Sequence, residues 1–195
     1  MSENLINNKK LAVIGCSGLV GSSIVRCSLE KGYQVNGTMR NIDDTTKIKY
    51  LKKLKNSKNL NFFKADMFRN NDFDFCLQDV STLFIACLIP SYKGFDGTLA
   101  KELDDKRGYD EIINPTVNGC LNILKSAKKF DVKHVVICSS TSSTNPIPSV
   151  LIKNEIDHWS DEIEQCKSKK YTSATKTIME KAAIKFCNDN NIRLS

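Results

Sequence analysis

Short apolar runs alternate with amphipathic stretches along almost the whole chain. The apolar runs suit strands, and the stretches between them carry apolar residues at helical spacing. We predict strands at residues 11–14, 33–39, 60–64, 82–89, 134–138 and 191–195, and helices at 19–31, 73–77, 111–130 and 174–188, with a lysine-rich helix before residue 60. This order predicts an α/β protein with a doubly wound parallel sheet, the Rossmann fold, and helices on both faces. The sixth strand is only begun where the chain stops, so we expect an incomplete sheet.

Composition fits one globular domain over residues 1–195, with 41% hydrophobic residues. The net charge of +7 comes largely from lysines, many of them between Lys47 and Lys64. Ile48, Leu51 and Leu54 recur among them at near-helical spacing, which predicts a solvated face of a surface helix. A nucleic-acid patch is the alternative, but the run contains no arginine and few aromatic residues. Attraction of a phosphorylated cofactor or of an acidic ligand is a milder alternative.

Eight cysteines are scattered through the predicted strands and helices, and no pair has the spacing of metal ligands. We expect free thiols in a reducing, cytoplasmic setting and no bound metal. The N-terminal residues 1–10 are polar, and no apolar run has the length of a membrane span. The sequence therefore predicts a soluble protein without a signal peptide.

Three glycines spaced three apart follow the first predicted strand, at Gly15, Gly18 and Gly21. Between a strand and an amphipathic helix, such glycines allow a tight turn, close approach of a pyrophosphate and close packing of the helix on the sheet. Backbone amides at the helix start then hold the negative charge. The candidate cofactor residues here are Gly15, Ser17, Gly18, Leu19, Val20 and Gly21.

The residue after the second predicted strand is Arg40. Proteins of this fold that bind NAD place an acid at this point for the ribose hydroxyls, whereas a guanidinium suits the 2′-phosphate of NADP. The sequence therefore favours NADP, although Arg40 could also be an ordinary exposed cation. Asp66, after the third strand, is a candidate acceptor for the adenine amino group or, alternatively, a helix cap.

Several motifs resemble the extended short-chain dehydrogenase/reductases, in the branch that contains dihydroflavonol and cinnamoyl-CoA reductases. They are the glycine turn, Arg40, Ala65-Asp66-Met67 with Phe73, Leu83 to Cys87, Asn114 to Leu124, Val135 to Ser140 and Lys176 to Ala183. The resemblance implies NADPH-dependent reduction of a carbonyl group in a small organic substrate. It also implies that Met67, Ala86 and Lys176 contact the cofactor.

The same resemblance implies a catalytic serine, tyrosine and lysine. Ser140 matches the serine, with Ser139 as the alternative, and Lys176 matches the lysine. The family places its tyrosine four residues before the lysine, a position that Thr172 occupies here. Tyr171 lies five before, and five steps of about 100° put two helical side chains roughly 140° apart. A bulge or late helix start could restore the pair, and loss of the original tyrosine is equally compatible.

Three functions stay open on these grounds. The first is an NADP-dependent carbonyl reductase, weak or inactive without the C-terminal substrate region that the family carries beyond this point. The second is a catalytically silent NADP-binding or partner-binding protein, in which a homo-oligomer or partner covers the incomplete sheet edge. The third is a nucleotide-sugar epimerase or dehydratase of the same superfamily.

Overall fold

The computed structural model describes residues 9–195. Residues 1–8, on which most of the signal-peptide argument rests, lie outside the described part. The described chain packs as two compact units. Unit 1 contains residues 9–87, Asn122–Cys138 and Cys187–Ser195, and unit 2 contains Leu88–Leu121 and Ser139–Phe186. The expectation of one domain over residues 1–195 stays a prediction.

Unit 1 is a six-stranded parallel sheet with the strand order β3-β2-β1-β4-β5-β6. The strands are β1 (Lys10–Ile14), β2 (Gln34–Met39), β3 (Leu60–Lys64), β4 (Val80–Ile85), β5 (His134–Ile137) and β6 (Arg193–Leu194). This is the strand order of the doubly wound dinucleotide-binding fold, which confirms the predicted fold class. The sheet ends at β6, a two-residue edge strand.

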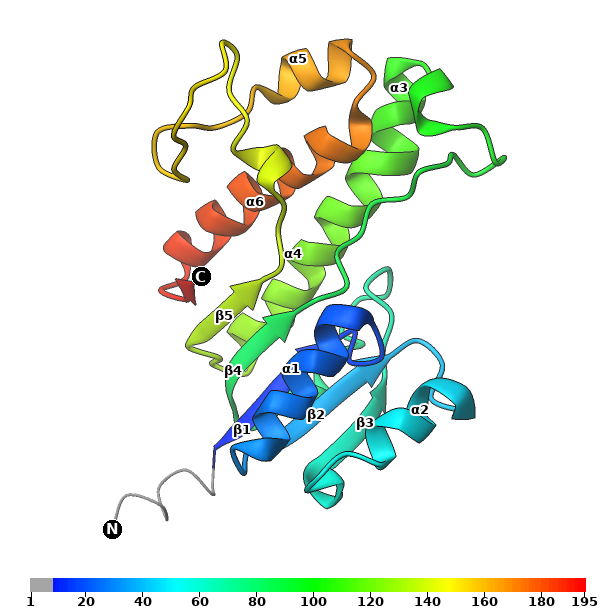
Figure 1. The fold of residues 1–195 in the computed structure, drawn as a ribbon, viewed down its shortest axis with the longest axis vertical. Coiled ribbons are helices and arrows are strands. Elements are labelled where there is room, and N and C mark those ends of the chain that lie inside the picture. The colour runs from blue at the N-terminus through cyan, green and yellow to red at the C-terminus, as the bar shows by residue number, and fades with distance from the viewer. Residues whose placement is uncertain (1–8) are drawn as a thin grey trace. The chain divides into compact units, whose positions relative to one another are not determined.

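Helices cover both faces of this sheet, as predicted (Figure 1). Helices α1 (Leu19–Glu30) and α2 (Thr45–Lys52) lie on one face, and the second half of α4 (Asn114–Lys129) lies on the other. Val25 and Leu29 of α1 and Leu51 of α2 pack with strand residues in one apolar cluster. Helix α2 is the predicted lysine-rich helix, and it buries Ile48 and Leu51 while its lysines face solvent.

Unit 2 is built mainly from helices. It contains α3 (Asp105–Arg107), the first half of α4, α5 (Glu162–Lys167) and most of α6 (Tyr171–Asp189). A wide π-helical turn, Gly108–Ile113, leads into α4. Pro115 lies in the first turn of α4, where its missing amide hydrogen interrupts the helical hydrogen-bond ladder. The core of this unit contains Leu103, Ile112, Ile113, Cys166, Tyr171 and Ala174.

Several elements differ from the sequence prediction, and the largest differences concern β4, α6 and α5. The fourth strand was expected to reach residue 89, but β4 ends at Ile85 because β1 and β5 end beside it, at Ile14 and Ile137. The last helix was expected to begin at residue 174, but α6 begins at Tyr171. Helix α5 was not predicted. Short 3-10 turns at Ser57–Asn59, Phe75–Leu77, Ala100–Glu102 and Thr141–Ser143 complete the assignment.

Candidate cofactor and catalytic sites

The predicted cofactor residues of unit 1 lie at the carboxyl ends of four neighbouring strands. The glycine turn follows β1, Arg40 follows β2, Asp66 lies just after β3, and Ala86 follows β4. Carboxyl ends of parallel strands share one edge of the sheet, which is where ligands of this fold bind. Residues separated widely in sequence are therefore brought to one edge.

The glycine turn is built around two close approaches of the backbone. Gly15 has a φ of +82°, which side chains rarely adopt, and a Cβ there would lie 2.7 Å from the Cβ of Cys87. A Cβ on Gly21 would lie 2.1 Å from the carbonyl oxygen of Gly15. Gly18 differs, because its added Cβ would make only an ordinary 3.5 Å contact. Gly15 and Gly21 are thus required by the fold, whereas Gly18 leaves open space beside the turn.

Hydrogen bonds show which amides of this turn are already used. Gly15 and Cys16 donate to the carbonyl oxygen of Thr38, and Gly18 donates to that of Gly15. The first bond within α1 runs from the Ser22 amide to the carbonyl oxygen of Gly18, at 2.8 Å. The amides of Leu19, Val20 and Gly21 precede that bond, and no side chain caps the helix. These amides, at the positive end of the helix dipole, suit a phosphate group.

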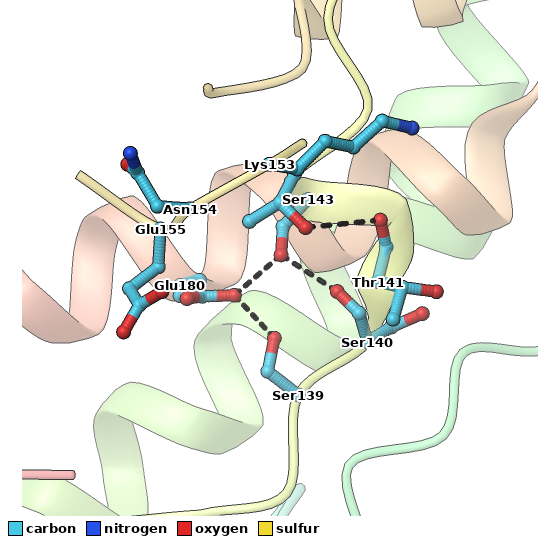
Figure 2. A pocket seen from close by; sticks show the side chains of 9 residues that line it. Ser139, Ser140, Thr141, Ser143, Lys153, Asn154, Glu155 and Glu180 are labelled. Atoms are coloured by element: carbon cyan, nitrogen blue, oxygen red, sulfur yellow. Dashed lines mark hydrogen bonds between the residues drawn. The ribbon is translucent and has the colours of Figure 1, made fainter. Parts of the chain in front are cut away.

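A cavity of about 470 Å³ in unit 2 is lined by Ser139, Ser140, Thr141, Ser143, Thr144, Lys153, Asn154, Glu155 and Glu180. Figure 2 shows the hydroxyls of Ser139 and Ser143 directed at the carboxylate of Glu180. The Ser143 hydroxyl lies 2.7 Å from two acceptors, Glu180 Oε2 and the carbonyl oxygen of Ser140, which share its single hydrogen. Glu180 therefore fixes the backbone of the serine loop through Ser143.

Ser140, the predicted catalytic serine, is exposed at the cavity wall. Its Oγ accepts hydrogen bonds from the Ser142 amide at 3.2 Å and from the Ser142 hydroxyl at 3.0 Å. Because both bonds use the Ser140 oxygen as acceptor, the hydroxyl hydrogen is available for donation. That geometry suits a group that donates to a carbonyl oxygen. Ser139, the alternative, donates to Glu180 instead.

Tyr171 is not directed at this cavity. Its side chain is fully buried in the core of unit 2, and its hydroxyl donates to Asp105 Oδ1 at 2.8 Å. Burial and the bond to Asp105 raise the pKa of Tyr171 well above its ordinary value of 10.0. A catalytic proton donor in this chemistry needs the opposite shift, toward neutral pH. The ring also packs so closely on Gly108 that any Cβ at that position would clash with it.

Lys176 lies five residues further along α6, and its Nζ donates to the carbonyl oxygen of Leu88 at 2.5 Å. Since α6 is regular helix from Tyr171 onward, the five-residue spacing is not corrected by a bulge or a late helix start. Lys176 and Tyr171 thus have different partners. Thr172, at the spacing of four, is half-buried.

Sequence reasoning assigned no role to several residues of these two regions. Glu180 lies four residues after Lys176 on α6, and that helical spacing was the available signal. Asp105, the first residue of α3, carried no such signal, because nothing in the local sequence indicates that a tyrosine distant in sequence will donate to it. Lys64, Arg69 and Asp72 line a second cavity with Arg40, Ala65 and Asp66.

Taken together, the sheet order and the glycine turn define the doubly wound class of dinucleotide-binding folds. Residues 12–195 match the 3-beta hydroxysteroid dehydrogenase/isomerase family, and the chain belongs to that family. No helix among residues 9–195 is both long and apolar enough to cross a membrane.

The chain is similar to plant reductases of the branch that its motifs resemble. It is 34% identical to dihydroflavonol 4-reductase of Callistephus chinensis, over 93% of this chain and 48% of that protein. It is 33% identical to cinnamoyl-CoA reductase CAD2 of Medicago truncatula, over 98% of this chain and 57% of that protein. The resemblance inferred from the motifs is thereby confirmed. The chain spans about half the length of these relatives.

A solved structure of Gre2 from Candida albicans in complex with NADPH is similar in fold. Its TM-score is 0.67 and its sequence identity 25%, over 96% of this chain and 55% of that protein.

Proposed function

We propose that this chain binds NADPH and is part of an NADP-dependent reductase acting on a carbonyl group of a small organic substrate. The observation that carries the proposal is the shared sheet edge in unit 1. There the glycine turn and Arg40 follow the neighbouring strands β1 and β2. The relatives named as reductases, and the similar fold of a protein solved with NADPH, support it.

The residues of unit 1 fit the cofactor in chemical terms. The amides of Leu19 and Val20 would hold the pyrophosphate, beside the space left open at Gly18. Arg40 would pair with the 2′-phosphate, and Asp66 would accept from the adenine amino group. When bound, the cofactor supplies a hydride. Met67 and Ala86, at the ends of β3 and β4, stay predictions as cofactor contacts.

The residues of unit 2 would act on the substrate. Ser140 would donate to the carbonyl oxygen and so stabilise the negative charge that develops there. Lys176 would add a positive charge, provided that it leaves the carbonyl oxygen of Leu88. Tyr171 cannot supply the proton from its position on Asp105. We therefore expect slow turnover.

Thr172→Tyr tests this explanation, because it places a phenol on the helix face of Lys176. NADPH oxidation would be followed by absorbance with aldehydes, cinnamoyl thioesters and dihydroflavonols. A positioned general acid contributes about 10² to 10⁴ in rate, so we expect a gain toward that range in Thr172→Tyr and none in Thr172→Phe. Rapid turnover by the parent that is lost in Tyr171→Phe would instead show that Tyr171 is the donor.

A second candidate is a silent NADP-binding protein, which the Tyr171–Asp105 bond favours. NADPH binding without turnover in the parent and in Thr172→Tyr would support it. Under either function we propose a cytoplasmic protein, because eight cysteines scattered through strands and helices do not form the spacing pattern of a disulfide framework and suit a reducing compartment. We also propose that a second copy or a partner covers the sheet edge at β6.

A further inference from the structure

The second cavity, of about 270 Å³, lies in unit 1 and is rich in positive charge. Its walls come from Arg40, Lys64, Ala65, Asp66, Arg69 and Asp72. Within residues 9–195, no ion pair is recorded for any of the three cations. Three positive and two negative side chains line this cavity, and the excess positive charge favours an anion beside the cations.

The turn after β3 brings Arg69 to this cavity. Asp66 Oδ1 accepts from the amide of Phe68 at 3.1 Å, and the carbonyl oxygen of Asp66 accepts from the amide of Arg69 at 3.0 Å. Asp72 Oδ2 accepts from the amide of Asp66 at 3.0 Å. Each carboxylate therefore accepts a hydrogen bond from a backbone amide of the turn, and among residues 9–195 neither is recorded in an ion pair with the three cations.

We propose that Arg69 is a specificity-determining residue that, with Lys64, joins Arg40 in a three-cation clamp for the 2′-phosphate of the cofactor. The inference rests on the proposed function and names a residue that the glycine turn and Arg40 do not imply. Two guanidinium groups and an ammonium can share the oxygens of one phosphate, the guanidinium groups by paired hydrogen bonds. NADH carries no such phosphate, so Arg69 should contribute to NADPH binding alone.

An adenosine 3′-phosphate, as in coenzyme A, has related chemistry, and the experiment separates the two. Isothermal titration of the full chain would compare NADPH, NADH, adenosine 2′,5′-bisphosphate and adenosine 3′,5′-bisphosphate. The variants are Arg69→Gln and, as a control with the same loss of charge, Lys58→Gln. Lys58 is exposed in the same unit and does not line the cavity.

We expect Arg69→Gln to weaken NADPH and adenosine 2′,5′-bisphosphate about fivefold, as for an exposed charge pair, with NADH unchanged. Lys58→Gln should leave all four affinities unchanged. Equal losses for NADPH and NADH, or no loss for either, would overturn the role of Arg69 while NADPH binding by the parent stands. Tighter binding of the 3′,5′-bisphosphate would assign the clamp to a 3′-phosphate instead. A parent that binds none of the four would refute the proposed function as well.

Discussion

Tyr171 acts, at the scale of a single residue, as a buried hydrogen-bond donor within the core of unit 2. Its ring packs with Leu103, Ile112 and Ala174, and its hydroxyl reaches Asp105. Tyr171 lies five residues before Lys176, whereas the catalytic tyrosine of the family lies four residues before its lysine. The register along α6 therefore decides whether the phenol stabilises the fold or takes part in chemistry.

Tyr171→Phe should lower the free energy of unfolding by about 1 kcal/mol, because it removes the bond to Asp105 and keeps the ring. The pKa of Tyr171 is raised in the folded chain, so the parent's advantage is full below pH 10, the ordinary tyrosine pKa, and shrinks as pH rises above it. Denaturant unfolding at pH 7 and pH 11 would measure both effects. Tyr92→Phe, at an exposed tyrosine, is the control and should change neither. A Tyr171→Phe chain as stable as the parent would contradict the structural role.

The glycine turn shows, at the scale of elements, how one segment serves both fold and ligand. Gly18→Val should abolish NADPH binding while the melting temperature stays near that of the parent, since an added side chain meets open space where the pyrophosphate would lie. Gly18→Ala, a smaller intrusion, should weaken binding less. Gly21→Ala should destabilise the chain instead, because its Cβ would overlap the carbonyl oxygen of Gly15. Full NADPH affinity in Gly18→Val would show that the turn does not hold phosphate.

Sequence periodicity predicted all six strands. Strands β1 and β2 are mostly buried runs, and the glycine turn after β1 follows a local rule. It missed α5 and the early start of α6, since Tyr171-Thr172-Ser173 carries hydroxyl side chains that do not favour helix. Tertiary packing overrides that preference, because Tyr171 gains a core position and Asp105 as partner. The contact between Tyr171 and Asp105 could not be predicted from local sequence, because the two residues lie 66 positions apart.

The cofactor edge was more predictable than the substrate side for a related reason. Arg40 directly follows β2, Asp66 is the second residue after β3, and the parallel fold places both at one edge of the sheet. Ser139 and Ser143 meet Glu180 only through the path of an irregular loop. Arg69 likewise depends on the turn that Asp66 and Asp72 build.

At the scale of the whole molecule, we expect all eight cysteines to be thiols, and they differ in accessibility. Burial raises the pKa of Cys16 and of Cys76 to about 12, whereas Cys27 and Cys138 are exposed. Alkylation of the native chain should therefore modify Cys27 and Cys138 first and Cys16 and Cys76 last. After denaturation without reductant, mass spectrometry should find all eight modified. Any pair protected in the denatured chain would reveal a disulfide and contradict the account.

Each unit of the molecule carries a separable task in this account. Unit 1 supplies the sheet edge, the turn and the cations, and unit 2 supplies Ser140, Lys176 and Glu180. If the position of Tyr171 prevents turnover, the chain should nevertheless bind the cofactor. The preference for NADPH over NADH consequently tests whether the sheet edge of unit 1 is an NADP site, and it does not depend on catalysis.

The most direct measurement is an isothermal titration of the parent chain and Arg40→Glu with NADPH and NADH. The parent should bind NADPH more tightly than NADH, because we propose that Arg40 pairs with the 2′-phosphate. Arg40→Glu should reverse that order, since a carboxylate repels the phosphate and accepts from ribose hydroxyls. Equal affinities of the parent for the two cofactors, or an unchanged preference in Arg40→Glu, would contradict the assignment of this sheet edge as an NADP site.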